Sequence, residues 1–212
     1  MKPIKDIVED AEGDLAKMNL FSTMNLFSTP VWHIDGTPED ILDEMIQGAY
    51  ACKENVKTAN RSNVSGYQSP CFTPDLFHKG AFEYLENQLK DTCPKFKLDV
   101  WWFNISGKGS YNVVHTHPKC DLALIWYLTD DDNKLSLCDP LWHSRAKLYA
   151  FLYGTDETPL RKDRNYHDVK KMNAKKGDII IFPGDLAHYV ETVETEQERI
   201  SISMNLTLPN ET

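Results

Sequence analysis

The stretch Val113–Leu128, VVHTHPKCDLALIWYL, places two histidines one residue apart, then a proline, then an almost unbroken apolar run. Side chains alternate across a strand, so His115 and His117 on one strand would point to the same face. A short apolar run that follows a proline is typical of a buried strand. The stretch therefore predicts two neighbouring strands, with a pair of imidazoles where the first one ends.

Short strand-like segments and turns continue on both sides of this stretch. They are residues 30–35, 97–106, 110–117, 122–129, 134–139, 177–182, 186–193 and 199–208. An amphipathic helix is expected at 37–55, capped by Thr37, and a second one after Thr73-Pro74, ending near Pro94. Segments 59–74 and 140–170 look irregular. This order predicts a mainly β (α+β) fold, a β-sandwich or jelly roll with two or three covering helices near the N-terminus.

Length and composition exclude several classes of protein. The 212 residues suit one domain, and a net charge of −9, from 23 basic and 32 acidic residues, argues against general nucleic-acid or anionic-membrane binding. No apolar run approaches the roughly 20 residues of a membrane span. The five cysteines are odd in number and lack a CxxC spacing, which favours reduced thiols in a cytoplasmic protein.

The N-terminal region contains a tandem repeat. MNLFST occurs at Met18–Thr23 and again at Met24–Thr29, and only the second copy leads into the expected first strand. Two copies of six residues are too few and too short for a repeat architecture. We therefore expect residues 1–23 to form a leader and residues 24–212 to form a single domain.

Three histidines and one arginine are candidates for chemistry. Paired imidazoles at this spacing can hold one metal ion, such as Fe, Zn, Cu or Ni, or can be ordinary polar residues at a strand end. His188 lies early in a later strand, and Arg199 begins the last one. Four polar side chains share one face of that last strand: Arg199, Ser201, Ser203 and Asn205. This face is either exposed to solvent or part of a polar interior in which Arg199 and Ser201 clamp a carboxylate.

Together, the segments HTHP, YL, GDIIIFPGDLAH and RISIS resemble the Fe(II)- and 2-oxoglutarate-dependent oxygenases, in particular the small oxygenases of marine bacteria and their phages. The resemblance covers about residues 96–206. It implies a double-stranded β-helix, the jelly roll of cupin-like proteins, with a metal held by His115, His117 and His188. It also implies that Arg199, helped by Ser201, pairs with the distal carboxylate of 2-oxoglutarate. Tyr127 and Asn104 are further candidates for cofactor binding.

The sequence departs from the wider superfamily at one ligand. Most members use HxD or HxE followed by a later histidine, whereas this chain has His117 where the carboxylate is expected. One interpretation is a three-histidine site, favoured by the spacing of His115 and His117. In the other, Asp121 supplies the carboxylate and only one of these two histidines binds.

The resemblance implies a dioxygenase that hydroxylates an unidentified substrate and releases succinate and CO2. The substrate would be a small molecule or a peptide, chosen by segments 55–75 and 139–172, and whether the chain forms a homodimer stays open. One alternative is a cupin-like metalloenzyme that does not use 2-oxoglutarate, although it gives no role to Arg199 and Ser201. The other is a non-catalytic jelly-roll binding module.

Overall fold

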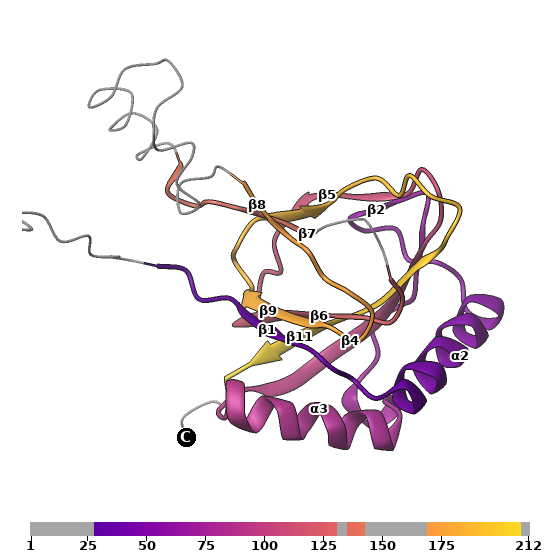
Figure 1. Ribbon diagram of the computed structural model, residues 1–212, viewed down its shortest axis with the longest axis horizontal. Coiled ribbons are helices and arrows are strands. Elements are labelled where there is room, and N and C mark those ends of the chain that lie inside the picture. The colour runs from indigo at the N-terminus through magenta and orange to yellow at the C-terminus, as the bar shows by residue number, and fades with distance from the viewer. Residues whose placement is uncertain (1–27, 131–134, 143–168, 209–212) are drawn as a thin grey trace, which may run out of the picture.

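The computed structural model describes residues 28–130, 135–142 and 169–208, and there it contains two antiparallel β-sheets and two α-helices (Figure 1). The predicted leader with its repeat lies outside the described residues, as does most of the segment 139–172. The two sheets lie face to face, and the apolar side chains between them form one core cluster. The predicted mainly β jelly roll is confirmed.

The larger sheet has six strands. In spatial order these are β1 (Trp32–Ile34), β9 (Ile179–Pro183), β6 (Leu122–Tyr127), β11 (Arg199–Thr207), β4 (Lys97–Ser106) and β3 (Tyr67–Gln68). The longest strands, β4 and β11, pair along nearly their whole length, from Arg199 opposite Ser106 to Thr207 opposite Lys97. β11 is therefore held on both sides, by β4 and by β6, along most of its course.

The smaller sheet has five strands. They are β2 (Asn63–Val64), β5 (Tyr111–His115), β10 (His188–Val190), β7 (Leu135–Cys138) and β8 (Val169–Met172). β2 and β3 fall in the segment 59–74 predicted to be irregular, and β8 begins at the end of the segment 140–170, so that prediction was wrong there. These three strands have only two to four residues each, which is too short for a clear alternating pattern.

Two helices cover the face of the larger sheet that points away from the smaller sheet (Figure 1). α2 spans Glu39–Asn55, and α3 spans Lys79–Thr92 after a 3-10 turn at Pro74–Leu76. Their apolar stripes are buried, as predicted, and meet the sheet through residues such as Leu42, Met45, Ala81, Leu85 and Leu89. The second helix begins later than expected, because Phe77 adopts extended backbone and His78 a non-helical conformation between the 3-10 turn and the helix.

Thr37 does not cap α2, contrary to the prediction. The N-cap is Pro38, with no side-chain hydrogen bond, and the Thr37 hydroxyl instead donates to the Gly177 carbonyl at 2.6 Å. The same hydroxyl accepts the indole N–H of Trp126 at 3.0 Å. Both partners are buried and have to be hydrogen-bonded. The Thr37 hydroxyl therefore bonds to them and not to the end of the helix.

Two further expectations concern cysteines and membranes. All five cysteines are free thiols. No helix within the described ranges is both long enough and apolar enough to cross a membrane. The cellular compartment stays a prediction.

Candidate active site

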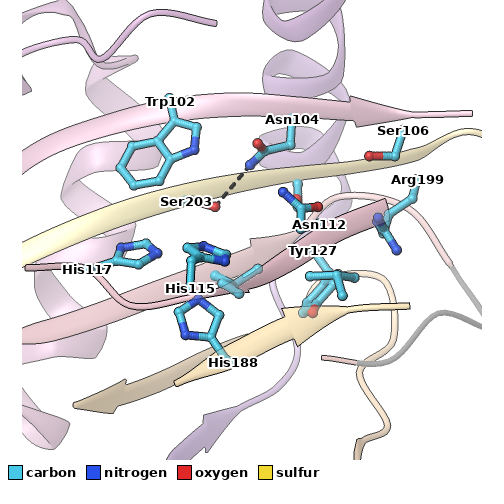
Figure 2. Close-up of a pocket in the computed structure, with 13 residues that line it drawn as sticks. Trp102, Asn104, Ser106, Asn112, His115, His117, Tyr127, His188, Arg199 and Ser203 are labelled. Carbon is cyan, nitrogen blue, oxygen red and sulfur yellow. Dashed lines mark hydrogen bonds between the residues drawn. The ribbon is translucent and has the colours of Figure 1, made fainter. Parts of the chain in front are cut away.

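Three histidines converge between the two sheets (Figure 2). His115 is the last residue of β5 and His188 the first of β10, and the two lie directly opposite each other in the ladder. Their ring centroids are 4.3 Å apart, and the His117 ring lies 5.3 Å from His115 and 5.0 Å from His188. Residues far apart in the sequence therefore form one cluster.

His117 is not on a strand, contrary to the prediction, because β5 ends at His115. The chain turns at Pro118 and Lys119, where Lys119 has a φ of 77°. The His117 backbone N–H donates to the Gly184 carbonyl at 2.7 Å, which ties this turn to the β9–β10 connection. A Cβ at Gly184 would lie 2.6 Å from the Cys120 carbonyl oxygen and sulfur, so only glycine allows this close approach.

In all three rings the same nitrogen, Nδ1, forms a hydrogen bond with an oxygen atom. The Nδ1 atoms of His115, His117 and His188 lie 2.8 Å from, respectively, the Val113 carbonyl, the Asn205 side-chain oxygen and the Leu186 carbonyl. A carbonyl oxygen can only accept, so each Nδ1 carries the proton. Each neutral ring therefore keeps its lone pair on Nε2, the arrangement that suits a metal ligand.

Burial keeps these imidazoles uncharged. Desolvation lowers the pKa of His115 and of His117, and it lowers the pKa of His188 to about 3. His115 and His117 add to the effect at His188 by charge repulsion. Neutral imidazoles at neutral pH are the form that binds metal ions.

The donor set fits an iron site. Ligand atoms from the three histidines all lie within 4.8 Å of one another. Three nitrogen ligands of one ion, each at about 2.1 Å from it, lie closer together than this limit, so the rings would move inward on binding. Three imidazoles suit Fe as well as Zn, Cu or Ni, so the donor set alone does not select the metal.

Arg199 lies at the other end of the same pocket (Figure 2). It is 4% exposed, and its Nη1 lies 3.5 Å from the Glu191 carbonyl. Ser201, Tyr127 and Asn104, the other predicted cofactor residues, also line this pocket. These three residues lie side by side on neighbouring strands, since Ser201 is the register partner of both Asn104 and Tyr127. The structure thus brings every predicted site residue into one pocket.

Six residues that line this pocket were not predicted as site residues: Trp102, Ser106, Asn112, Ile125, Val190 and Ser203. Ser203 accepts a hydrogen bond from the Asn104 amide at 3.0 Å, so its own hydroxyl hydrogen is available to the pocket (Figure 2). The ring of Trp102, opposite Ser203 in the ladder, lies 5.5 Å from the His117 ring. Asn205 does not line the pocket, but its side chain bonds to His117. Ser203 and Asn205 share the polar face with Arg199, and that pattern could have identified them.

Asp121, the alternative source of a carboxylate ligand, lies outside the histidine cluster. It is exposed, and its carboxylate accepts a hydrogen bond from the backbone N–H of Leu208, just beyond β11. Among the described residues, the cluster of candidate metal ligands contains the three histidines and not Asp121.

The comparisons with known proteins agree with this site. The model of a family described as "Putative 2OG-Fe(II) oxygenase" matches residues 100–205, the part of the chain that contains the three histidines and Arg199. No curated protein matches the sequence.

Several solved structures share the fold. HygX from Streptomyces hygroscopicus, with nickel and 2-oxoglutarate bound, superposes with a TM-score of 0.58 at 13% identity, covering 86% of this chain and 84% of its own. A prolyl-4-hydroxylase from Pseudomonas putida gives 0.56 at 10% identity, covering 86% and 95%. The carbocyclase SnoK from nogalamycin biosynthesis gives 0.56 at 14% identity, covering 84% and 79%. At such low identities the likeness extends to the fold alone.

Proposed function

Since the chain belongs to the 2OG-Fe(II) oxygenase family, we propose that His115, His117 and His188 hold the Fe(II) ion through their Nε2 atoms. We also propose that Arg199 binds the distal carboxylate of 2-oxoglutarate, with Ser201, Tyr127 and Asn104 beside it. The observation that carries this proposal is the uniform state of the three rings, in which every Nδ1 has an oxygen acceptor.

The two ends of the pocket suit the two ends of the cofactor. The histidine end is neutral and can take a cation, whereas the planar guanidinium of Arg199 matches a carboxylate with two parallel hydrogen bonds. Between them, Ser203 lines the pocket, and because its oxygen accepts from Asn104 its hydroxyl hydrogen remains for another acceptor. A dicarboxylate lying between the metal and Arg199 would therefore meet donors along its length.

With both cofactors bound, the family's chemistry is oxidation of a substrate C–H bond by dioxygen, coupled to conversion of 2-oxoglutarate into succinate and CO2. We propose that this enzyme hydroxylates its substrate. The protein holds the ligands in place and limits access of water, because the apolar side chains of Trp102, Ile125 and Val190 line the pocket beside the histidines. The net charge of −9 favours a small molecule or a peptide over nucleic acid as substrate.

The test is an anaerobic titration with Fe(II), with and without 2-oxoglutarate, monitored by the visible charge-transfer band of the chelated complex. We expect a band that needs both components. His188→Ala removes a metal ligand and should abolish the band, whereas Arg199→Ala should leave metal binding and weaken 2-oxoglutarate binding. Asp121→Ala is the control and should behave like the wild type, because its carboxylate lies outside the cluster.

Other outcomes would support other functions. Metal binding without a band, together with no effect of Arg199→Ala, would contradict the role of 2-oxoglutarate and favour a cupin-like metalloenzyme. No metal binding by the wild type would favour a binding module. Loss of the band in Asp121→Ala but not in His117→Ala would replace the three-histidine site by two histidines and a carboxylate.

A further inference from the structure

The three candidate ligands differ in what fixes their rings. His115 and His188 each hold Nδ1 on a carbonyl two residues earlier in the chain, Val113 and Leu186 respectively. These acceptors belong to the backbone, so no side-chain substitution removes them. His117 instead depends on a side chain 88 positions away, the amide oxygen of Asn205 at 2.8 Å.

His117 also needs more support than the other two. It lies in a turn beyond the end of β5, where no strand ladder fixes its direction. Its backbone N–H donates to Gly184 and its carbonyl accepts from the Cys120 thiol, but these bonds do not set the rotation of the imidazole. The residue is 8% exposed, so water has little access to replace a missing partner.

Asn205 is well placed to supply that support. It lies on β11, where it pairs with Val100 of β4 on one side and with Ala123 of β6 on the other. The register between β11 and β4 shifts directly after it, where Leu206 lies opposite Leu98 and Asp99 of β4 has no register partner. Bulges of this kind often adjust the direction of side chains near functional sites.

We propose that Asn205 is a positioning residue for the metal centre, one that selects the Nδ1–H tautomer of His117 and so presents its Nε2 to the metal. This inference rests on the proposed function, because it takes His117 as a ligand. A partner of this kind orients a ligating histidine, and its loss typically costs about 10- to 100-fold in metal affinity. Asn205 provides an acceptor without adding a charge to the site.

Two substitutions separate the hydrogen bond from the shape of the side chain. Asn205→Asp keeps an oxygen acceptor in the same shape, whereas Asn205→Leu keeps a similar volume without an acceptor. Thr207→Val, on the same strand and two residues further, is the matched control. We would measure the affinity for Co(II), as a spectroscopic substitute for Fe(II), and the melting temperature of each metal-free variant.

The expected result is specific to the acceptor. Asn205→Leu should bind Co(II) about 10- to 100-fold more weakly than the wild type, while Asn205→Asp binds at least as tightly as the wild type. Thr207→Val should be unchanged, and all melting temperatures should agree within about 3 °C. Wild-type affinity in Asn205→Leu would overturn the proposal. An equal loss in Asn205→Asp would do the same, because this variant keeps both the shape of the side chain and its oxygen acceptor.

A second readout does not depend on the metal. Nitrogen-15 NMR of the metal-free protein distinguishes the two neutral tautomers, and His117 should carry its proton on Nδ1 in the wild type and lose this preference in Asn205→Leu. An Nε2–H tautomer in the wild type would refute the inference. His188→Ala, titrated in parallel, tests the proposed function separately: if it binds Co(II) as the wild type does, the three-histidine site is wrong even where the tautomer result holds.

Discussion

The central strands β4, β6 and β11 of the larger sheet have two very different faces. The outer face is wholly apolar and packs against α2 and α3, with Trp101, Phe103, Trp126, Ile202 and Met204 among its members. The inner face of the same strands carries a set of polar side chains: Asn104, Ser106, Tyr127, Arg199, Ser201 and Ser203. Neighbouring residues in the sequence thus belong to different environments.

The difference shows how one strand can serve stability and function at once. The outer face removes large apolar side chains from water, which is the main favourable contribution to folding. The inner face buries polar groups, and these require partners such as the hydrogen bond between Asn104 and Ser203. Substitutions on the outer face should therefore affect unfolding, whereas those on the inner face should affect ligands.

Among substitutions on the outer face, Trp126→Ala should lower the free energy of unfolding most. Trp126 is fully buried, stacks on Tyr84 with ring centroids 5.7 Å apart, and donates its indole N–H to Thr37. Its loss leaves a cavity and removes one of the two hydrogen bonds of the Thr37 hydroxyl, and we expect a decrease of about 3–5 kcal/mol in the free energy of unfolding. Urea denaturation measures this decrease.

The separation of the two faces would be wrong if Trp126→Ala also changed the metal affinity of the histidine site. Co(II) affinity, measured where the variant is still folded, should equal that of the wild type, because the indole lies on the opposite face from the histidines. Val114→Ala is a suitable control, since Val114 is 61% exposed and its truncation should leave stability within about 0.5 kcal/mol of the wild type.

Sequence periodicity predicted both faces of β11. The alternation of Ile200, Ile202 and Met204 with Arg199, Ser201 and Ser203 assigned the faces, although it left open whether the polar face met solvent or an interior. It also placed β4 at residues 97–106, the range observed. Long strands with one buried face carry a strong pattern, which explains this success.

The remaining features depend on contacts that no local pattern encodes. Thr37 stands at the position of a helix cap and is a residue type that favours it. Its hydroxyl nevertheless bonds to Gly177 and Trp126, which are distant in the sequence. His117 was expected on a strand because the HxH spacing fits one, but the turn at Pro118 ends the ladder earlier. The partnership of His117 with Asn205 joins residues that only the folded sheet brings together.

A smaller effect is expected for Asp121→Ala, which belongs to neither face. The Asp121 carboxylate accepts the backbone N–H of Leu208 just past the end of β11. Losing one exposed hydrogen bond should lower the free energy of unfolding by about 1 kcal/mol. Metal affinity should not change. A decrease in affinity comparable to that of His188→Ala would mean that Asp121 reaches the metal in solution, and the separation of the site from this edge would be wrong.

The smallest effect is expected for Glu198→Gln, at the residue that precedes Arg199. Glu198 accepts hydrogen bonds from Lys53 and Tyr50 of α2, each at 2.9 Å, and so links the helix to the start of β11. The hydrogen bond from Lys53, followed by that from Tyr50, lowers the pKa of Glu198, while partial burial opposes this shift. Since the side chain is 34% exposed, we expect the substitution to cost only about 0.2–1 kcal/mol at pH 7.

The pH dependence identifies this contribution. Because the pKa of Glu198 is lower in the folded than in the unfolded protein, its stabilisation is complete above the ordinary value of 4.5 and is lost as the pH falls through the lowered folded value. The difference in unfolding free energy between wild type and Glu198→Gln should therefore shrink as the pH falls below 4.5. A difference that stays constant down to pH values well below 4.5 would show that charge plays no part. The link between α2 and the Arg199 end of the pocket would then rest on hydrogen-bond geometry alone.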